Sequence, residues 1–281
     1  MKNNTIVIIG LGLMGGSFAY ALKNFKNSII IGVDNDPIVC ENALKKGAVD
    51  KIDNISNSIK QADLVIFCTH PVHILQSLEQ YAHIFKKDSI ITEICGVKRH
   101  ISQTAIKFLP ENVDYVGIHP MAGKEVSGFS NADKEIFKNC GFIITPIEST
   151  KNTTIELMKN IANHIGTDRI AVLNAENHDS QIAYSSDLMH ISASALCTEF
   201  PNEFKMTYTA GAFRDCTRIA QLNPDLWADL LIENSIETEK KLAIYIENLT
   251  AFKQALNEKN RDSLRYLLDK GNQNKQEMQK R

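Results

Sequence analysis

The chain has 281 residues, of which 43% are hydrophobic and 23% charged, as in ordinary soluble globular enzymes. Its 31 basic and 33 acidic residues give a net charge of −2 without a long basic run, which argues against nucleic acid as a partner. The six cysteines lack the paired spacing of metal ligands, so we expect no metal site and a reducing, cytoplasmic location.

The first half of the chain alternates short apolar runs with helical segments, which is typical of a parallel sheet flanked by helices. The near-continuous hydrophobicity of the runs predicts strands that are buried on both faces. The expected strands are Thr5–Ile9, Ile29–Val33, Leu64–Thr69, Ser89–Ile94, Tyr115–Ile118, Phe142–Thr145 and an edge strand Arg169–Leu173. The expected helices include Gly15–Lys23, His73–Tyr81 and Thr153–Ile165.

A glycine-rich loop follows the first strand and opens the first helix. Gly10 is expected to permit a tight turn, Gly12 the approach of a pyrophosphate, and Gly15 close packing of the helix on the strand. Backbone N–H groups around Leu13 and Met14, at the start of the helix, are expected to bind the diphosphate. This context predicts a Rossmann-type doubly wound sheet, and the glycines argue against a signal peptide or membrane span.

Asp34 ends the second strand, where a carboxylate can accept both hydroxyls of the adenosine ribose and repel a 2′-phosphate. Asn35 and Asp36 offer no cation to such a phosphate, so we expect NAD as the cofactor rather than NADP. The competing interpretation of Asp34 is a helix N-cap or turn residue.

The segment His119–Glu125, with the sequence HPMAGKE, follows the apparent buried strand Asp114–Ile118. The carboxyl ends of the strands form the ligand crevice of a doubly wound sheet. A histidine there can exchange a proton near neutral pH, and the turn that follows lets a substrate approach. For His119 taken alone, a structural histidine in a tight loop is the competing interpretation.

The strand signal fades after residue 173, so we expect a dinucleotide-binding domain over 1–173 and an all-α domain over 174–281 for substrate binding and dimerisation. The first helix of the second domain is expected over Glu176–Thr198. Asp225–Lys259 contains neither Gly nor Pro and predicts one long helix, packed either across a dimer or in the core of one subunit.

The C-terminal segment is expected to form one shorter helix, Asp262–Lys270, that ends at Gly271 as its C-terminal cap. The polar tail Asn272–Arg281 is then expected to be frayed.

Two polar clusters fall in the helical half. His178 and Asp179 are adjacent, and His190 follows Ser186 by four residues, on the same helix face. Arg218 lies in FRDCTRIA, and an arginine at a cleft can bind a carboxylate through two parallel hydrogen bonds. Each cluster alone is better explained as a surface ion pair or a helix cap, but together with His119 they form a constellation.

In these motifs the chain resembles the prephenate/arogenate dehydrogenase family. The similar segments are GLGLMGGS at Gly10–Ser17, HPMAGKE at His119–Glu125, HD at His178–Asp179, S-x-L-x-H at Ser186–His190, FRDxTRIA at Phe213–Ala220 and PDLW at Pro224–Trp227. The glycine motif is common to many dehydrogenases, whereas the others in this order are specific.

The resemblance implies a monofunctional, NAD-dependent oxidoreductase that converts prephenate to 4-hydroxyphenylpyruvate in tyrosine biosynthesis, working as a homodimer. It implies that His119 takes the proton of the ring hydroxyl and that Arg218 holds a substrate carboxylate. Glu125, His178 and His190 are then expected to bind the substrate or to gate its pocket.

Two positions depart from the family pattern. Gly96 stands where the family commonly has a serine that assists the histidine, so that role is dispensable or passes to Cys95 or a water. Asp187 stands inside the Ser186–His190 motif, where it either attracts the ammonium group of arogenate or is exposed and silent. Trp227 is either a core anchor or a wall of the site.

Three other functions compete with this one. An arogenate dehydrogenase would form tyrosine directly at the same site. A β-hydroxyacid dehydrogenase has a similar glycine loop, but relies on a catalytic lysine in its helical domain. A protein that only senses NAD would keep the glycines and Asp34, but would not need His119 and Arg218 together.

Overall fold

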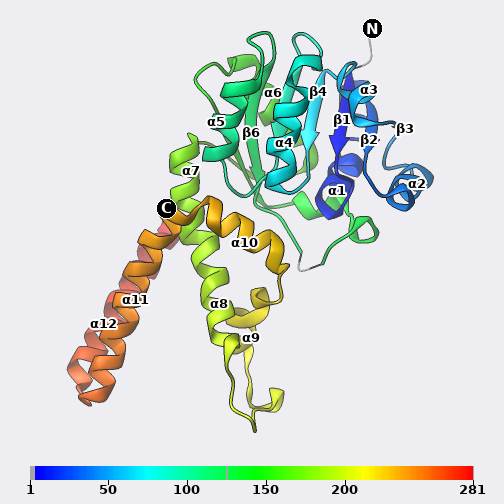
Figure 1. Ribbon diagram of the computed structural model, residues 1–281. Helices are drawn as coiled ribbons and strands as arrows, with labels where there is room; N and C mark the ends of the chain where they lie inside the picture. Colours follow the sequence, from blue (N-terminus) through cyan, green and yellow to red (C-terminus); the bar gives the residue numbers. More distant parts are fainter. Residues whose placement is uncertain (1–3, 125, 281) are drawn as a thin grey trace. The chain divides into compact units, whose positions relative to one another are not determined.

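The computed structural model describes residues 4–124 and 126–280, so the role predicted for Glu125 lies outside the described residues. Residues 5–172 contain an eight-stranded sheet in the order β3-β2-β1-β4-β5-β6-β7-β8 (Figure 1). The strands are β1 Thr5–Ile9, β2 Ile29–Val33, β3 Lys51–Ile52, β4 Leu64–Phe67, β5 Ile90–Glu93, β6 Asp114–Pro120, β7 Gly141–Pro146 and β8 Arg169–Val172. All the predicted strands are confirmed, and the two-residue edge strand β3 is the one that the sequence did not predict.

The sheet is mostly parallel, as the predicted doubly wound fold requires, and it contains one antiparallel pair that the sequence did not indicate. β7 runs antiparallel to β6, and His119 pairs with Ile143 across them. The described part of the connection between these strands carries short 3-10 turns, Phe129–Asn131 and Lys134–Phe137, in place of a crossover helix. Antiparallel neighbours need no crossover helix, so the chain turns back beside the strand that carries His119.

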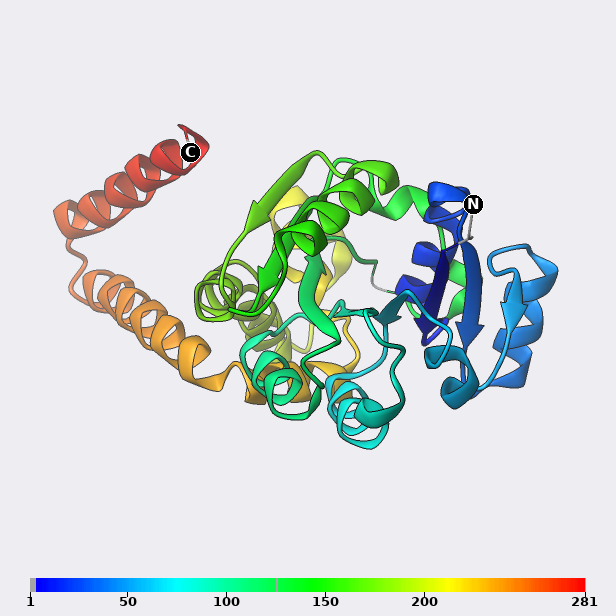
Figure 2. The same cartoon turned by 90° about the horizontal axis from the view of Figure 1, so that it is seen from above.

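Helices cover both faces of the sheet, and the core has two halves. Ile6 and Ile8 of β1 pack with residues of α1, α2 and α6, whereas Val7 and Ile9 pack with residues of α3, α4 and α5. Figure 2 shows α6 on one side of the sheet and α4 and α5 on the other. The expected burial on both faces is confirmed for the central strands β1, β4, β5 and β6, since successive side chains of a strand point to opposite faces, whereas the edge strand β8 is mostly exposed.

The helices that cover the sheet are α1 Leu13–Ala21, α2 Pro37–Lys45, α3 Ile55–Ile59, α4 Pro71–Tyr81, α5 Arg99–Phe108 and α6 Asn152–Ile165. Those that follow the sheet are α7 Ala175–Ile182, α8 Leu188–Thr198, α9 Gly211–Thr217, α10 Pro224–Glu233, α11 Ser235–Asn257 and α12 Arg261–Lys280. None of the described helices is both long enough and apolar enough to cross a membrane.

The helix predicted over 176–198 forms, but a π-helical turn, Ala183–Asp187, separates α7 from α8. The single helix predicted over 225–259 is wrong, because the chain leaves helical geometry at Asn234, with φ −101° and ψ 16°. The buried Asn234 amide donates hydrogen bonds to the Asp179 carbonyl, at 3.0 Å, and to Asp187 Oδ2, at 2.7 Å. The helix thus ends where Asn234 contacts Asp179 and Asp187, residues distant in the sequence, and no local sequence signal marks this end.

The predicted end of the last helix at Gly271 is also wrong, as is the frayed tail, because α12 continues to Lys280. A glycine inside a helix costs about 1 kcal/mol relative to alanine, and the Gln, Lys, Glu and Met residues after it favour helix. By its internal contacts the chain forms two compact units, Met1–Asn234 and Ser235–Arg281. The domain boundary after residue 173 stays a prediction.

Candidate active site

A cavity of about 950 Å³ lies within the first unit, at the carboxyl ends of β5 and β6. The sheet side of the cavity contributes His70, Gly96, Val97 and the described residues of His119–Ser127. The helical side contributes Ile182, Ser186, Asp187, His190, Ile219, Gln221–Leu222, Asn223–Pro224, Leu226–Trp227 and Leu230. The crevice expected at His119 is therefore present, and its size suits a small molecule.

The three glycines of the loop have the geometry that a bound diphosphate requires. Gly10 has φ +88°, and a Cβ there would meet the Cys68 carbonyl oxygen at 2.9 Å. A Cβ at Gly15 would lie 1.8 Å from the Gly10 carbonyl oxygen, so α1 packs too closely for any side chain. Gly12 precedes α1 and has nothing within 4 Å of a Cβ position, which leaves the start of the helix open. These residues fit a dinucleotide.

Asp34 lies directly after β2 and is partly exposed beside this loop. Its Oδ2 accepts a hydrogen bond from the Leu11 N–H at 2.7 Å, and its Oδ1 accepts one from the Asp36 N–H at 2.9 Å. The side chain is therefore a turn residue, as the competing interpretation holds. A carboxylate has about four acceptor positions, so it also keeps capacity for ribose hydroxyls.

A buried ion pair fixes the end of β6 where His119 begins the cavity wall. Lys98 Nζ donates to Glu93 Oε1 at 2.8 Å and to the Ile118 carbonyl at 2.6 Å. Glu93 Oε2 accepts the Cys95 N–H at 2.7 Å. Both charged side chains are at most 1% exposed. Burial raises the pKa of Glu93, and the Lys98 ammonium opposes that rise.

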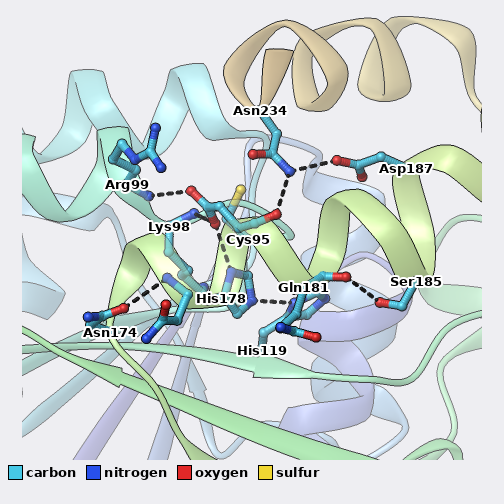
Figure 3. A network of polar contacts seen from close by, with 12 residues as sticks. Cys95, Lys98, Arg99, His119, Asn174, His178, Gln181, Ser185, Asp187 and Asn234 are labelled. Carbon is cyan, nitrogen blue, oxygen red and sulfur yellow. Dashed lines mark hydrogen bonds and ion pairs between the residues drawn. The ribbon is translucent and has the colours of Figure 1, made fainter. Parts of the chain in front are cut away.

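His119 is hydrogen-bonded to a second histidine, which in turn contacts a carboxylate (Figure 3). His119 Nδ1 lies 2.9 Å from His178 Nε2, and His178 Nδ1 lies 2.8 Å from Asp179 Oδ1. The Asp179 carboxylate also accepts the backbone N–H groups of Lys98 and Arg99, each at 2.9 Å. The backbone at the start of α5 thus fixes the Asp179 carboxylate. The carboxylate orients the His178 ring directly and the His119 ring through His178.

The surroundings of His119 and His178 favour the neutral form of both rings. Burial lowers the pKa of His119 well below its ordinary value of 6.5, and the nearby His178 and Lys98 lower it further. Burial also lowers the pKa of His178, although its hydrogen bond to Asp179 opposes the change. A neutral His119 at the cavity can accept a proton without first losing one.

The opposite wall of the cavity is built around His190. Its Nδ1 lies 3.0 Å from the Ser186 carbonyl oxygen, and its ring stacks on Trp227 with centroids 3.6 Å apart. Burial lowers the pKa of His190. Trp227 lines the cavity, so it is a wall of the site rather than only a core anchor. Asp187 also lines the cavity and is 2% exposed, so the interpretation of it as an exposed, silent residue is wrong.

The structure does not bring all the predicted residues to the cavity surface. His178 is fully buried behind His119. Arg218 begins a 3-10 turn and is exposed, whereas its neighbour Ile219 lines the cavity. The sequence interpretation missed the contacts of Lys98 with Ile118 and of Asn234 with Asp179 and Asp187, since these partners lie 20 or more residues away and no local spacing marks them.

Gly96 leaves room beside His119. A Cβ at Gly96 would lie 3.6 Å from Leu230 Cδ2 and 4.0 Å from His119 Cε1, which are ordinary contact distances. Position 96 is therefore open to a small side chain, although the sequence supplies no hydroxyl there.

Comparison with known proteins gives matches over most of the chain. The nucleotide-binding domain of prephenate dehydrogenase matches residues 18–171, and the dimerization domain of prephenate dehydrogenase matches residues 174–270. The chain is 35% identical to a prephenate dehydrogenase of Bacillus subtilis over 82% of this chain, but the match spans only 64% of that protein. It is 33% identical to a cyclohexadienyl dehydrogenase of Zymomonas mobilis over 94% of this chain and 91% of that protein.

A solved structure agrees with these matches. Prephenate dehydrogenase from A. aeolicus, in complex with hydroxyphenyl propionate and NAD+, is 25% identical and superposes with a TM-score of 0.86. The superposition covers 98% of this chain and 99% of that chain.

We expect Gly96→Ser to fold normally, because its Cβ meets no atom closer than 3.6 Å. The thermal unfolding midpoint should change by less than about 2–4 °C, the shift that 1 kcal/mol produces in a chain of this size. Gly117→Ala is the control, because its Cβ would lie 2.3 Å from Thr145 Oγ1 and 2.8 Å from Glu93 Oε1. That crowding should cost about 1–3 kcal/mol. Equal losses in the two variants would contradict the open space at Gly96.

Proposed function

Because the chain belongs to the prephenate dehydrogenase family, we propose that it catalyses the NAD-dependent oxidative decarboxylation of prephenate to 4-hydroxyphenylpyruvate, a step of tyrosine biosynthesis. The observation that carries this proposal is His119, which lines the cavity, is hydrogen-bonded to His178 and has its pKa lowered by burial. The cavity opens at the carboxyl ends of the strands, where this type of sheet binds its ligands.

The chain's own task in this reaction is to orient the substrate and to move one proton. His119 Nε2 accepts the proton of the ring hydroxyl, and the carbinol carbon becomes a carbonyl carbon. NAD, when bound, supplies the acceptor for the hydride that this carbon loses. The ring carboxylate leaves as CO2, its bonding electron pair aromatises the ring, and His119 returns the proton to the phenolate oxygen.

Two further roles within this proposal concern binding. Arg218 holds a substrate carboxylate, and its place next to the cavity-lining Ile219 supports that role. His190 contacts the side-chain end of the substrate from the opposite wall, with its ring held by Trp227. The loop glycines and Asp34 hold NAD, and the acidic Asp34 disfavours the 2′-phosphate of NADP.

Arogenate is the second candidate substrate, and Asp187 favours it. A buried carboxylate on the cavity wall complements an ammonium group, which arogenate has and prephenate lacks. The Asn234 amide binds Asp187 Oδ2 and holds that carboxylate in place. On arogenate the same proton and hydride transfers would give tyrosine directly.

The proposed function is tested by assaying the protein with prephenate and arogenate, each with NAD and NADP, and following the reduced cofactor by absorbance. We expect turnover with prephenate and NAD, and little with NADP. Turnover with arogenate alone would move the assignment to the second candidate, and Asp187→Asn should then raise KM for arogenate. A protein that binds NAD but turns over neither substrate would contradict the enzymatic function and leave an NAD-sensing role.

The same assay tests the two assigned side chains. His119→Asn should mainly lower kcat, because it removes the proton acceptor, while Arg218→Ala should mainly raise KM. His83→Asn is a matched control, because His83 is exposed in the 3-10 turn after α4 and lies outside the cavity. Normal kinetics in both site variants would show that the residues are wrongly assigned.

We also propose that the protein is a cytoplasmic homodimer. The free state of all six cysteines supports a reducing compartment. Exposed apolar side chains on α11, including Ile246 and Leu249, support an interface. The match of residues 174–270 to a dimerization domain points to the same part of the chain.

The dimer is tested by light scattering coupled to size-exclusion chromatography. We expect the mass of a dimer for the unchanged protein and a shift toward monomer for Ile246→Asp combined with Leu249→Asp, because two charges would be buried in an apolar interface. Asn248→Asp, on another face of the same exposed stretch, is the control. A monomer in the unchanged protein would contradict the proposal.

A further inference from the structure

The hydrogen-bonded chain Asp179–His178–His119 leads from the start of α5 to the cavity. Figure 3 shows the link between the His178 and His119 rings. Each link has geometry suited to a hydrogen bond, at 2.8 Å between Asp179 and His178 and at 2.9 Å between the two rings. His178 and Asp179 are at most 1% exposed, so water does not compete for these bonds. The donor and acceptor in each link can therefore be worked out in order.

The assignment of donors and acceptors starts at Asp179, because both oxygens of an ionised carboxylate can only accept hydrogen bonds. The Asp179 carboxylate accepts two backbone N–H groups at the start of α5, where the helix dipole also favours a negative charge. His178 Nδ1 must therefore carry the hydrogen in its bond to Asp179. A neutral imidazole carries one ring hydrogen, so His178 Nε2 is left as an acceptor.

The same rule applied to the next ring fixes His119. Its Nδ1 faces the acceptor His178 Nε2 and must donate. Neutral His119 then has no hydrogen on Nε2, the remaining ring nitrogen of a side chain that lines the cavity. A hydrogen on Nε2 would instead make that nitrogen a donor and unable to accept the hydroxyl proton.

We propose that His178 and Asp179 are positioning residues that hold His119 in the tautomer with a bare Nε2 and compensate the charge that forms when His119 takes a proton. His178 thus acts through His119 rather than by touching the substrate. The catalytic part of this inference rests on the proposed function, whereas the tautomer does not.

The compensation of charge has a physical reason in the surroundings of His119. The ring lies near the buried Lys98 ammonium, which opposes a second positive charge. Glu93 offsets part of the Lys98 charge through their ion pair. The Asp179 carboxylate lies one ring away, and a proton shift from His119 to His178 would bring the positive charge into contact with it. The arrangement also suits a site that has Gly96 where a serine hydroxyl could assist His119. The hydrogen bond from His119 Nδ1 to His178 orients the ring without such a hydroxyl.

The tautomer is tested by NMR on the full-length protein labelled with 15N-histidine, in which ring nitrogens with and without hydrogen have distinct shifts. His119→Asn identifies the His119 signals. We expect a bare Nε2 and a protonated Nδ1 on His119 at neutral pH. A hydrogen on His119 Nε2 would overturn the proposal whatever the substrate is.

The role of His178 is tested by a pair of variants. His178→Phe removes the acceptor for His119 Nδ1, so the His119 hydrogen should move toward Nε2, the form that neutral histidine favours in water. The value of kcat should fall on the order of 10²-fold or more, as when a catalytic histidine loses its tautomer, with KM little changed. His178→Gln supplies a carbonyl oxygen as acceptor and should recover part of both the tautomer and kcat.

Asp114→Asn controls for the loss of a buried carboxylate at a helix start. Asp114 accepts the Lys151 N–H before α6 and lies outside the cavity. This variant should leave kcat and the His119 tautomer unchanged, whereas Asp179→Asn should lower kcat.

Three results separate the alternatives. A raised KM with unchanged kcat in His178→Phe would show that His178 binds substrate and would overturn the positioning role. An unchanged tautomer and unchanged kcat would overturn it as well. If the unchanged protein turns over no substrate, the proposed function fails. The inference is then decided only by the His119 tautomer, measured in the unchanged protein and in His178→Gln.

Discussion

The Asp179 carboxylate is the constraint on which the rest of the site depends. It joins the start of α5, beside the sheet, to α7, in the helical half, through two backbone N–H groups. The backbone carbonyl of Asp179 accepts a hydrogen bond from the Asn234 amide, which also donates to Asp187 on the cavity wall. One residue therefore ties the sheet, the two histidines and the end of α10 into a single network. Removing one partner would leave buried polar groups unsatisfied, at about 1–3 kcal/mol each.

The second constraint is electrostatic. Lys98 and Glu93 are a buried pair, and burial of such a pair is favourable only when its hydrogen bonds are satisfied. Here the Ile118 carbonyl and the Cys95 N–H complete the pair, and they also fix the backbone on either side of Gly96 and His119. Burial, together with the nearby His178 and the Lys98 ammonium, lowers the pKa of His119 and so favours its neutral form. In the proposed mechanism His119 would accept a proton, and the Asp179 carboxylate would limit the cost of charging it.

The sequence predicted the parts of the molecule that depend on local patterns. Apolar runs identified the strands, and the loop from Gly10 gave the nucleotide-binding start, because only glycine permits that turn and packing. The place of His119 at the cavity was predictable because the sequence puts it at the carboxyl end of a buried strand. The parts that depend on distant contacts were not predictable. Asn234 breaks a helix that lacks Gly and Pro, and the burial of His178 behind His119 follows from how α7 packs on the sheet.

The central claim is that a partly buried, neutral His119 accepts the substrate's proton, and the pH dependence of kcat/KM tests it most directly. The neutral form is the active one, and burial lowers the pKa of His119 well below 6.5. Activity should therefore persist as the pH falls through 6.5 and be lost only at lower pH, since the acid limb of kcat/KM reports the base in the free enzyme. An acid limb at or above pH 6.5 would contradict the account.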